Sequence, residues 1–225
     1  EGDSWKQVGG DIDGEAKDDL SGYSVSLSAD GNRVAIGAYG NDGGGINSGH
    51  VRVYDLAGDT WNQVGDDIDG ETGLVFLYNW YGYYMGHEAG DHFGYSVSLS
   101  ADGSRVAIGA PKNEGDSGHV RVYQFDGNAW SQMGRDIDGE AAGDNFVGGD
   151  IDGEARGDQS GWSVSLSADG KRVAIGAPYN DGRDIYSGHV RIYEFEANSW
   201  KQLGCDIDGE AHGDQSGKSV SLSAD

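Results

Sequence analysis

Hydrophobic and polar side chains alternate strictly in several short segments of the chain. Val25 and Leu27 alternate with serines in the segment 24–28, and Val51 and Val53 alternate with polar residues in the segment 50–54. Alternation with a period of two predicts strands that bury one face. The turn residues Ala-Asp-Gly at 29–31 separate SVSLS from RVAIG, which predicts a hairpin. No window of useful length has the 3.6-residue period of a helix.

The same segments recur along the chain. SGYSVSLSADGNRVAIGA at 21–38 returns as FGYSVSLSADGSRVAIGA at 93–110 and as SGWSVSLSADGKRVAIGA at 160–177, and SGKSVSLSAD starts a fourth copy at 216–225. Each complete copy continues through HVRVY or HVRIY to a W-x-Q-x-G segment and then DIDGE. Equivalent leucines lie 72, 67 and 56 residues apart, and two insertions account for the irregularity. The underlying repeat is therefore about 55 residues long.

Four predicted strands per repeat are typical of a β-propeller blade. The repeat units are 21–71, 93–140 and 160–210, with a partial unit at 216–225 and insertions at 72–88 and 141–154. We expect an all-β fold in which 1–225 form one propeller segment of four-stranded antiparallel blades. Three blades are complete, and single strands at 5–12 and 219–223 flank them. Closed propellers have about four to eight blades, so we expect either a longer array, for example a seven-bladed one, or closure by association with other copies.

These repeats resemble the FG-GAP repeats of the integrin α-subunit head and related extracellular β-propellers. The segment 93–111, FGYSVSLSADGSRVAIGAP, carries both the FG and the GAP elements. The other copies have Ser-Gly in place of Phe-Gly, and Tyr39 replaces the proline of GAP in the first copy. The resemblance covers nearly the whole chain outside the insertions. It implies a seven-bladed propeller outside the cytoplasm that serves in adhesion or ligand binding and is not usually catalytic.

One feature of that family is missing from this sequence. Many members carry a D-x-D-x-D-G calcium loop in the hairpin between the first and second strands. Here each such hairpin has a single carboxylate, at Asp30, Asp102 or Asp169. One carboxylate cannot supply the roughly six to eight oxygen ligands that Ca²⁺ prefers. We therefore do not expect the metal site of the family at these hairpins.

The net charge of the chain limits the classes of partner that it can bind. There are 39 acidic and 15 basic residues, a net charge of −24. Such a chain repels nucleic acids and anionic membrane surfaces, and no stretch approaches the roughly 20 apolar residues of a membrane span. No signal peptide is visible in this segment, which starts with charged residues. We expect a protein or glycan ligand, or other copies of the chain, and the family resemblance implies a location outside the cell or at its surface.

The DIDGE elements are the densest carboxylate feature. Asp-x-Asp places both carboxylates on one side of an extended strand, and the glycine lets the glutamate join them. This pattern suggests a calcium site, the only cofactor that the sequence indicates, with the candidate ligands Asp11, Asp13, Glu15, Asp136, Asp138, Glu140, Asp150, Asp152, Glu154, Asp206, Asp208 and Glu210. The alternative is a structural role. The acids would then pair with the repeated arginines at 33, 105 and 172 and at 52, 121 and 191, or keep the outer strand from pairing edge to edge.

Repeated polar residues indicate scaffold rather than catalysis. Histidines recur at the same place in every unit, His50, His119 and His189, whereas a catalytic histidine is normally a single position. The serines of SVSLS recur with no neighbouring base. We therefore expect no enzymatic activity; a propeller hydrolase or lyase would need an unrepeated polar cluster at the central channel. The only cysteine, Cys205, is expected to be an exposed thiol, either inert or linked to another chain.

The insertion 72–88, TGLVFLYNWYGYYMGHE, has no counterpart in the other units. It lacks Lys and Arg and holds six aromatic residues, Phe76, Tyr78, Trp80, Tyr81, Tyr83 and Tyr84. Rigid aromatic side chains anchor interfaces, so an exposed hairpin here would stack on sugar rings or dock a neighbouring subunit. The alternatives are a local extension of the core and an error in the sequence of this segment.

From these features we expect a non-catalytic extracellular module, built from FG-GAP-like repeats, with a binding, adhesive or structural role. The main alternative is a self-assembling fibre or sheath protein that uses the aromatic insertion and the open blades.

Overall fold

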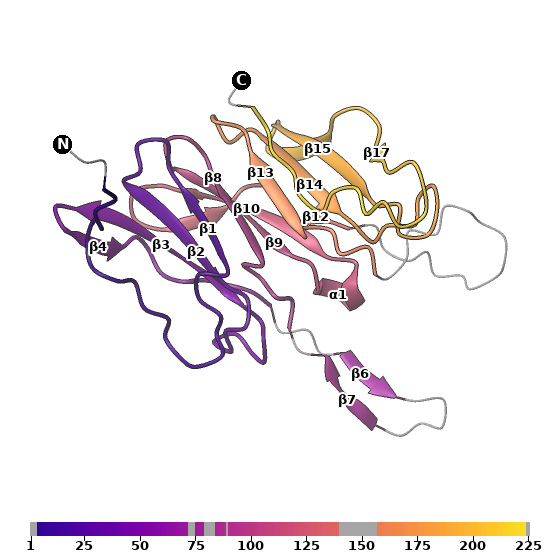
Figure 1. Ribbon diagram of the computed structural model, residues 1–225, viewed down its shortest axis with the longest axis horizontal. Coiled ribbons are helices and arrows are strands. Elements are labelled where there is room, and N and C mark those ends of the chain that lie inside the picture. The colour runs from indigo at the N-terminus through magenta and orange to yellow at the C-terminus, as the bar shows by residue number, and fades with distance from the viewer. Residues whose placement is uncertain (1–3, 72–74, 79–83, 89, 140–156, 224–225) are drawn as a thin grey trace.

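The computed structural model describes residues 4–71, 75–78, 84–88, 90–139 and 157–223. Its strands form three successive antiparallel sheets, which lie side by side in chain order (Figure 1). The first sheet holds β1 (Ser24–Leu27), β2 (Arg33–Ala38), β3 (His50–Ala57), β4 (Thr60–Gln63) and β5 (Ile68–Asp69). The second holds β8 (Ser96–Leu99), β9 (Arg105–Ala110), β10 (His119–Phe125), β11 (Trp130–Gln132) and β12 (Ile137–Asp138). The third holds β13 (Ser163–Leu166), β14 (Arg172–Ala177), β15 (His189–Glu196), β16 (Ser199–Gln202) and β17 (Ile207–Asp208).

This architecture confirms the all-β prediction of four-stranded antiparallel blades. The path of the first sheet is β1-β2-β3-β4, and the other two sheets repeat it. The register repeats as well: Leu27 pairs with Val34, Leu99 with Val106, and Leu166 with Val173. The described residues contain one short helix, α1 (Asn113–Asp116), in the β9–β10 loop. No described helix has the length and apolar character needed to cross a membrane.

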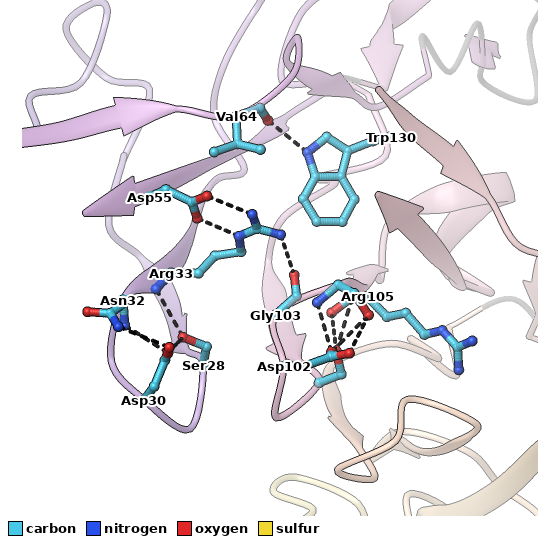
Figure 2. Close-up of polar contacts among 12 residues, drawn as sticks. Ser28, Asp30, Asn32, Arg33, Asp55, Val64, Asp102, Gly103, Arg105 and Trp130 are labelled. Carbon is cyan, nitrogen blue, oxygen red and sulfur yellow. Dashed lines mark hydrogen bonds and ion pairs between the residues drawn. The ribbon is translucent and has the colours of Figure 1, made fainter. Parts of the chain in front are cut away.

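The hairpin between the first two strands of each blade closes on its single aspartate. Asp30 accepts hydrogen bonds from Ser28 Oγ (2.6 Å) and from the backbone N of Asn32 (3.0 Å), as Figure 2 shows. These bonds lower the pKa of Asp30 to about 2, so its carboxylate stays charged at neutral pH. The aspartate that the sequence left without a metal role is thus a turn-forming group.

The outer strand of each blade differs from the prediction. The sequence predicts one continuous strand from the tryptophan to DIDGE, whereas β4 and β5 are separate pieces that both pair with β3. Gly65 lies between them with φ of +73°, and Gly134 and Gly204 have the same conformation in the other blades. A left-handed residue cannot continue a pleated strand, so each outer strand breaks there and resumes at DIDGE.

The two flanking segments also differ from the prediction. Residues 5–12 and 219–223 form no strand in this structure. They nevertheless contact the blades. Trp61 donates its indole N–H to Val8 O (3.1 Å), and Leu222 donates its backbone N–H to Ser165 Oγ (3.0 Å).

Apolar residues fill the space between neighbouring blades. One cluster joins Val51, Val53 and Ile68 of the first blade to Phe93 and Leu99 of the second, and an equivalent cluster joins the second blade to the third. Because strand residues alternate between the two faces, each sheet contributes one face to each neighbour. The core therefore lies between the sheets rather than within one of them.

The serines of SVSLS hydrogen-bond across the blade junctions. Ser24 Oγ donates to Gly94 O (2.7 Å), and Ser26 Oγ accepts the backbone N–H of Leu99 (2.9 Å). The same bonds join the second blade to the third, at 2.8 and 2.9 Å. The outer edge adds a third bond, from Trp130 Nε1 to Val64 O (2.8 Å; Figure 2). Repetition of these residues thus follows from repetition of the junction.

Candidate functional site

The DIDGE carboxylates lie beside the repeated histidines and beside one of the two sets of repeated arginines. This second set consists of Arg52, Arg121 and Arg191. The histidine starts the third strand of a blade, the arginine follows two residues later, and the short DIDGE strand pairs back onto that histidine. In the second blade Arg121 Nη2 lies 2.7 Å from Asp136 Oδ2 and 2.6 Å from Glu71 Oε1. Glu71 belongs to the DIDGE of the preceding blade. The cluster therefore joins two blades through one guanidinium.

The other two clusters follow the same plan. Arg191 Nε and Nη2 donate to the two carboxylate oxygens of Asp206, at 2.9 and 2.7 Å. Arg52 Nη1 lies 3.5 Å from Glu15 Oε1, and Arg52 Nη2 donates to the backbone O of Asp13 at 3.0 Å. Sequence reasoning placed the acids with one another or with either arginine set, and it did not place the histidines among them.

Burial sets the protonation state of these groups. Burial, reinforced by the adjacent arginines, lowers the pKa of His119 and of His189 to about 4, so both are neutral at pH 7. Hydrogen bonds from Arg191 lower the pKa of Asp206 despite its partial burial. Hydrogen bonds from Arg121 and Gln132 likewise outweigh burial and lower the pKa of Asp136. In the second and third clusters a neutral histidine thus lies beside a charged aspartate.

The first set of arginines contacts strand and hairpin residues instead. This set consists of Arg33, Arg105 and Arg172. Arg33 forms a two-point ion pair with Asp55 and donates from Nη1 to Gly103 O of the next blade (3.0 Å; Figure 2). Arg105 Nη1 donates to Asp169 O at 2.7 Å, and Arg172 pairs with Glu194 at 3.0 Å. In the described part of the chain these arginines contact strand and hairpin residues, whereas Arg52, Arg121 and Arg191 contact DIDGE, so the two sets have separate roles.

Calcium binding by DIDGE stays a prediction. Among the described residues, three groups combine one histidine nitrogen with two carboxylates whose ligand atoms lie within 4.8 Å of one another, namely Glu15, His50 and Asp67; His119, Asp136 and Asp138; and His189, Asp206 and Asp208. Each group has fewer than the roughly six oxygen ligands that Ca²⁺ takes, and a guanidinium already neutralises charge beside it. Of the other candidates, Asp11 accepts from Gln7 Nε2 at 2.8 Å and Glu210 is exposed. Glu140, Asp150, Asp152 and Glu154 lie outside the described residues.

The insertion forms a two-stranded hairpin, β6 (Val75–Tyr78) and β7 (Tyr84–Glu88), which projects away from the three sheets (Figure 1). The backbone positions of Phe76, Tyr78 and Tyr84 lie on these strands. Trp80, Tyr81 and Tyr83 lie outside the described residues. The binding role of these six aromatic residues stays a prediction.

A row of aromatic rings that sequence reasoning missed crosses all three blades. We call it the aromatic row; it consists of Tyr23, Tyr39, His92, Tyr95, Trp162, Tyr179 and Tyr186. Tyr23, Tyr95 and Trp162 each follow the glycine of FG or SG, and their ring centroids lie 5.0 and 4.8 Å apart. A signal for it exists in the sequence, since every complete copy has an aromatic residue between that glycine and SVSLS.

Comparison with curated proteins gave no match. Among solved structures, TolB from Acinetobacter baumannii aligns at 15% identity and a TM-score of 0.39, covering 81% of this chain and 32% of its own. Sqt1 from Saccharomyces cerevisiae aligns at 15% identity and a TM-score of 0.46, covering 88% and 37%, and a putative TolB from Agrobacterium tumefaciens at 16% and 0.38, covering 84% and 47%. The chain thus spans less than half the length of each of these structures.

The FG-GAP repeat matches at residues 12–54, 86–123 and 151–193. Each match contains the first two strands of one blade and ends within the third strand of that blade. The three matches together cover more than half of the chain, and therefore this protein belongs to the FG-GAP repeat family.

Proposed function

We infer that this protein is a non-catalytic binding or adhesion module that acts outside the cell. The observation that carries the inference is the use of the repeated reactive side chains in the scaffold. An acyl-transfer serine needs a free hydroxyl beside a base, but Ser24 and Ser96 donate across blade junctions to Gly94 O and Gly161 O. A hydroxyl engaged in this way at every junction has a packing role.

The histidines support the same conclusion. His119 and His189 are buried, and their pKa values of about 4 leave them uncharged at neutral pH. A general base works best when its pKa lies near the operating pH and when the atom that accepts the proton is accessible to substrate. Burial at three equivalent positions therefore favours a structural role over catalysis.

Exposed rings supply a surface for binding. Tyr23 and Tyr186 are 51% and 48% exposed, and they lie at opposite ends of the aromatic row. Large exposed aromatic side chains are typical of interaction surfaces. The location outside the cell rests on membership of the FG-GAP repeat family and remains part of this proposal.

An array of purified extracellular proteins and glycans tests the proposal. We expect labelled protein to bind at least one member, with binding weakened by Tyr23→Ala and unchanged by Trp5→Ala, a fully exposed tryptophan outside the row. A parallel screen with chromogenic esters, glycosides and phosphates should give no turnover. Turnover that a single side-chain change abolishes would show that the protein is an enzyme instead.

Self-assembly is the second candidate function, and the end faces of the sheets favour it. Leu27 on the first blade is 60% exposed, whereas the equivalent Leu99 is 7% exposed. Ile207 on the third blade is 55% exposed, whereas Ile137 is 5% exposed. Each end thus presents one half of the interface that joins neighbouring blades.

Sizing at several concentrations tests this candidate. Association through these faces predicts a mass that grows with concentration and returns to that of a monomer in Leu27→Asp. The control is Ile46→Asp, because Ile46 is equally exposed (61%) but lies in the β2–β3 loop. A constant monomer mass for the unaltered protein would rule out self-assembly.

A further inference from the structure

We propose that the aromatic row is a binding site for a neutral, unbranched oligosaccharide. This inference rests on the proposed binding function and names the ligand class and the surface. It differs from the sequence prediction of glycan binding by the insertion, since none of the rings of the row belongs to residues 72–88.

The rings form a continuous surface. Along the row, Tyr23 contacts Tyr95 (5.0 Å between centroids), Tyr95 contacts Trp162 (4.8 Å), Trp162 contacts Tyr179 (5.6 Å) and Tyr179 contacts Tyr186 (5.8 Å). Tyr39 and His92 widen the row where the first blade meets the second, and their ring centroids lie 5.1 Å apart. Each ring is held by its neighbours in tilted or edge-to-face contact, so little conformational entropy is lost when a ligand covers them.

The blade plan explains why the rings meet at one end of the molecule. Tyr23, Tyr95 and Trp162 precede β1, β8 and β13, the strands through which neighbouring blades contact each other. The glycine before each ring has φ of +85° or +86°. The left-handed glycine turns the chain identically in each blade, and the three rings therefore lie next to one another although about 70 residues separate them in sequence.

The carboxylates that flank the row are used inside the fold. Asp19 accepts hydrogen bonds from Asn41 Nδ2 (3.0 Å) and Ala16 N (3.1 Å), and Asp158 accepts from Asn180 Nδ2 (2.7 Å). Asp91 accepts from Glu71 N at 3.1 Å. All three carboxylates are buried, so they do not form a cationic-ligand site on the exposed side of the rings.

Two basic groups near the row are also engaged within the fold, and shifted pKa values keep two of its rings uncharged at neutral pH. Lys112 forms an ion pair with Asp116 (3.0 Å), and Lys218 donates to Gln215 Oε1 (2.8 Å). Burial lowers the pKa of His92, and burial together with the Tyr23 hydroxyl raises the pKa of Tyr95. The rings of His92 and Tyr95 therefore carry no charge at neutral pH, whereas the exposed Asp181, which accepts the backbone N–H of Tyr186 at 2.7 Å, lies at one end of the row.

A neutral sugar fits this surface better than a charged ligand. Pyranose rings have an apolar face of C–H groups that packs on aromatic rings, and hydroxyl groups at their edges that bond to tyrosine hydroxyls. Anionic sugars would be repelled by the net charge, and a cationic ligand cannot reach the buried carboxylates of Asp19, Asp91 and Asp158. A row of rings suits an extended oligosaccharide, since each ring can stack on a successive sugar unit.

Calorimetric titration with defined oligosaccharides tests the proposal. The probes are cellohexaose, xylohexaose and mannohexaose, with hexagalacturonate as the anionic probe and hexaarginine as the cationic one. We expect at least one neutral hexasaccharide to bind, and we expect Tyr23→Ala and Trp162→Ala each to weaken that binding about tenfold by removing a stacking surface. Trp5→Ala, which removes an exposed tryptophan outside the row, should leave binding unchanged.

Thermal unfolding of each variant shows whether a loss of binding reflects a loss of fold. If Trp162→Ala unfolds, Tyr23→Ala and Tyr186→Ala replace it, because both side chains are about half exposed. The proposal is overturned if no neutral hexasaccharide binds at millimolar concentration, or if hexaarginine alone binds in a Tyr23-dependent manner. A protein partner on the array with no bound sugar would end this inference and leave the proposed binding function intact; no binding by either assay would end both.

Discussion

Gly109 offers a direct test of how closely the second and third blades pack. It lies in β9, and a Cβ added there would overlap Gly161 O of the next blade and Ser96 Oγ. Its φ is not positive, so alanine introduces no backbone strain and acts through packing alone. Gly109→Ala must therefore push the blades apart and break the bond from Ser96 Oγ to Gly161 O (2.8 Å).

The expected cost is about 1.5–3.5 kcal/mol. Overpacking contributes roughly 1–3 kcal/mol, and the lost hydrogen bond about 1 kcal/mol. The lower entropy of the unfolded alanine chain offsets about 0.5 kcal/mol of this. Urea unfolding followed by tryptophan fluorescence measures the loss as a lower midpoint.

Equivalent positions and a matched control complete the test. Gly37→Ala and Gly176→Ala should cost a similar amount, because added Cβ atoms there would overlap Gly94 O and Gly217 O. Gly10→Ala should change stability by less than about 0.5 kcal/mol, since nothing lies within 4 Å of its added Cβ. An unchanged midpoint for Gly109→Ala would refute the close backbone approach between blades.

Three further predictions concern the charged clusters. The unfolded chain binds protons at histidine near pH 6.5, whereas His119 and His189 bind them near pH 4, so the unfolded state holds more protons between these values and stability falls as the pH drops through that window. The fall should be about 3 kcal/mol per histidine in urea titrations, and a flat profile would contradict the burial of these rings. Arg121→Leu should cost roughly 2–4 kcal/mol in the same assay, because it leaves Asp136 half-buried without its partner, while the exposed pair of Arg172 tolerates Arg172→Leu within about 1 kcal/mol; equal losses would refute the distinction. Chelator and millimolar Ca²⁺ should leave the melting temperature unchanged, since Arg121 and Arg191 already bond the carboxylates of Asp136 and Asp206, and a rise of several degrees with Ca²⁺ would instead support the metal site.

Local patterns carried most of the fold prediction. Alternation around Val25 and Leu27 and the Ala-Asp-Gly turn are properties of adjacent residues, so the blade hairpins could be predicted from sequence. The break of the outer strand was missed, because W-x-Q-x-G-x-D-I was treated as one strand through Gly65, although Trp61 and Ile68 would then lie on opposite faces. Only the left-handed conformation of that glycine ends the strand.

The sites were harder to predict because they form between repeats. Glu71 belongs to one DIDGE, yet it pairs with Arg121 of the next blade, so grouping the acids within one element could not place it. Tyr23, Tyr95 and Trp162 occupy one repeat position and form a surface only when the blades stack. Equivalent positions of successive repeats lie next to one another across the blade junctions. Comparing these positions between repeats would have indicated the pair of Glu71 with Arg121 and the aromatic row.

The serine bonds at the blade junctions have a consequence for how such a chain can change in length. Every unit brings a donor and an acceptor on one side, at Ser96 and Ser98, and the matching carbonyl and N–H on the other, at Gly94 and Leu99. Duplicating or deleting one whole unit therefore recreates compatible joints without any compensating substitution. Genetic variation by entire modules is then structurally neutral, whereas a shift of a few residues within a module would misalign both of its joints at once.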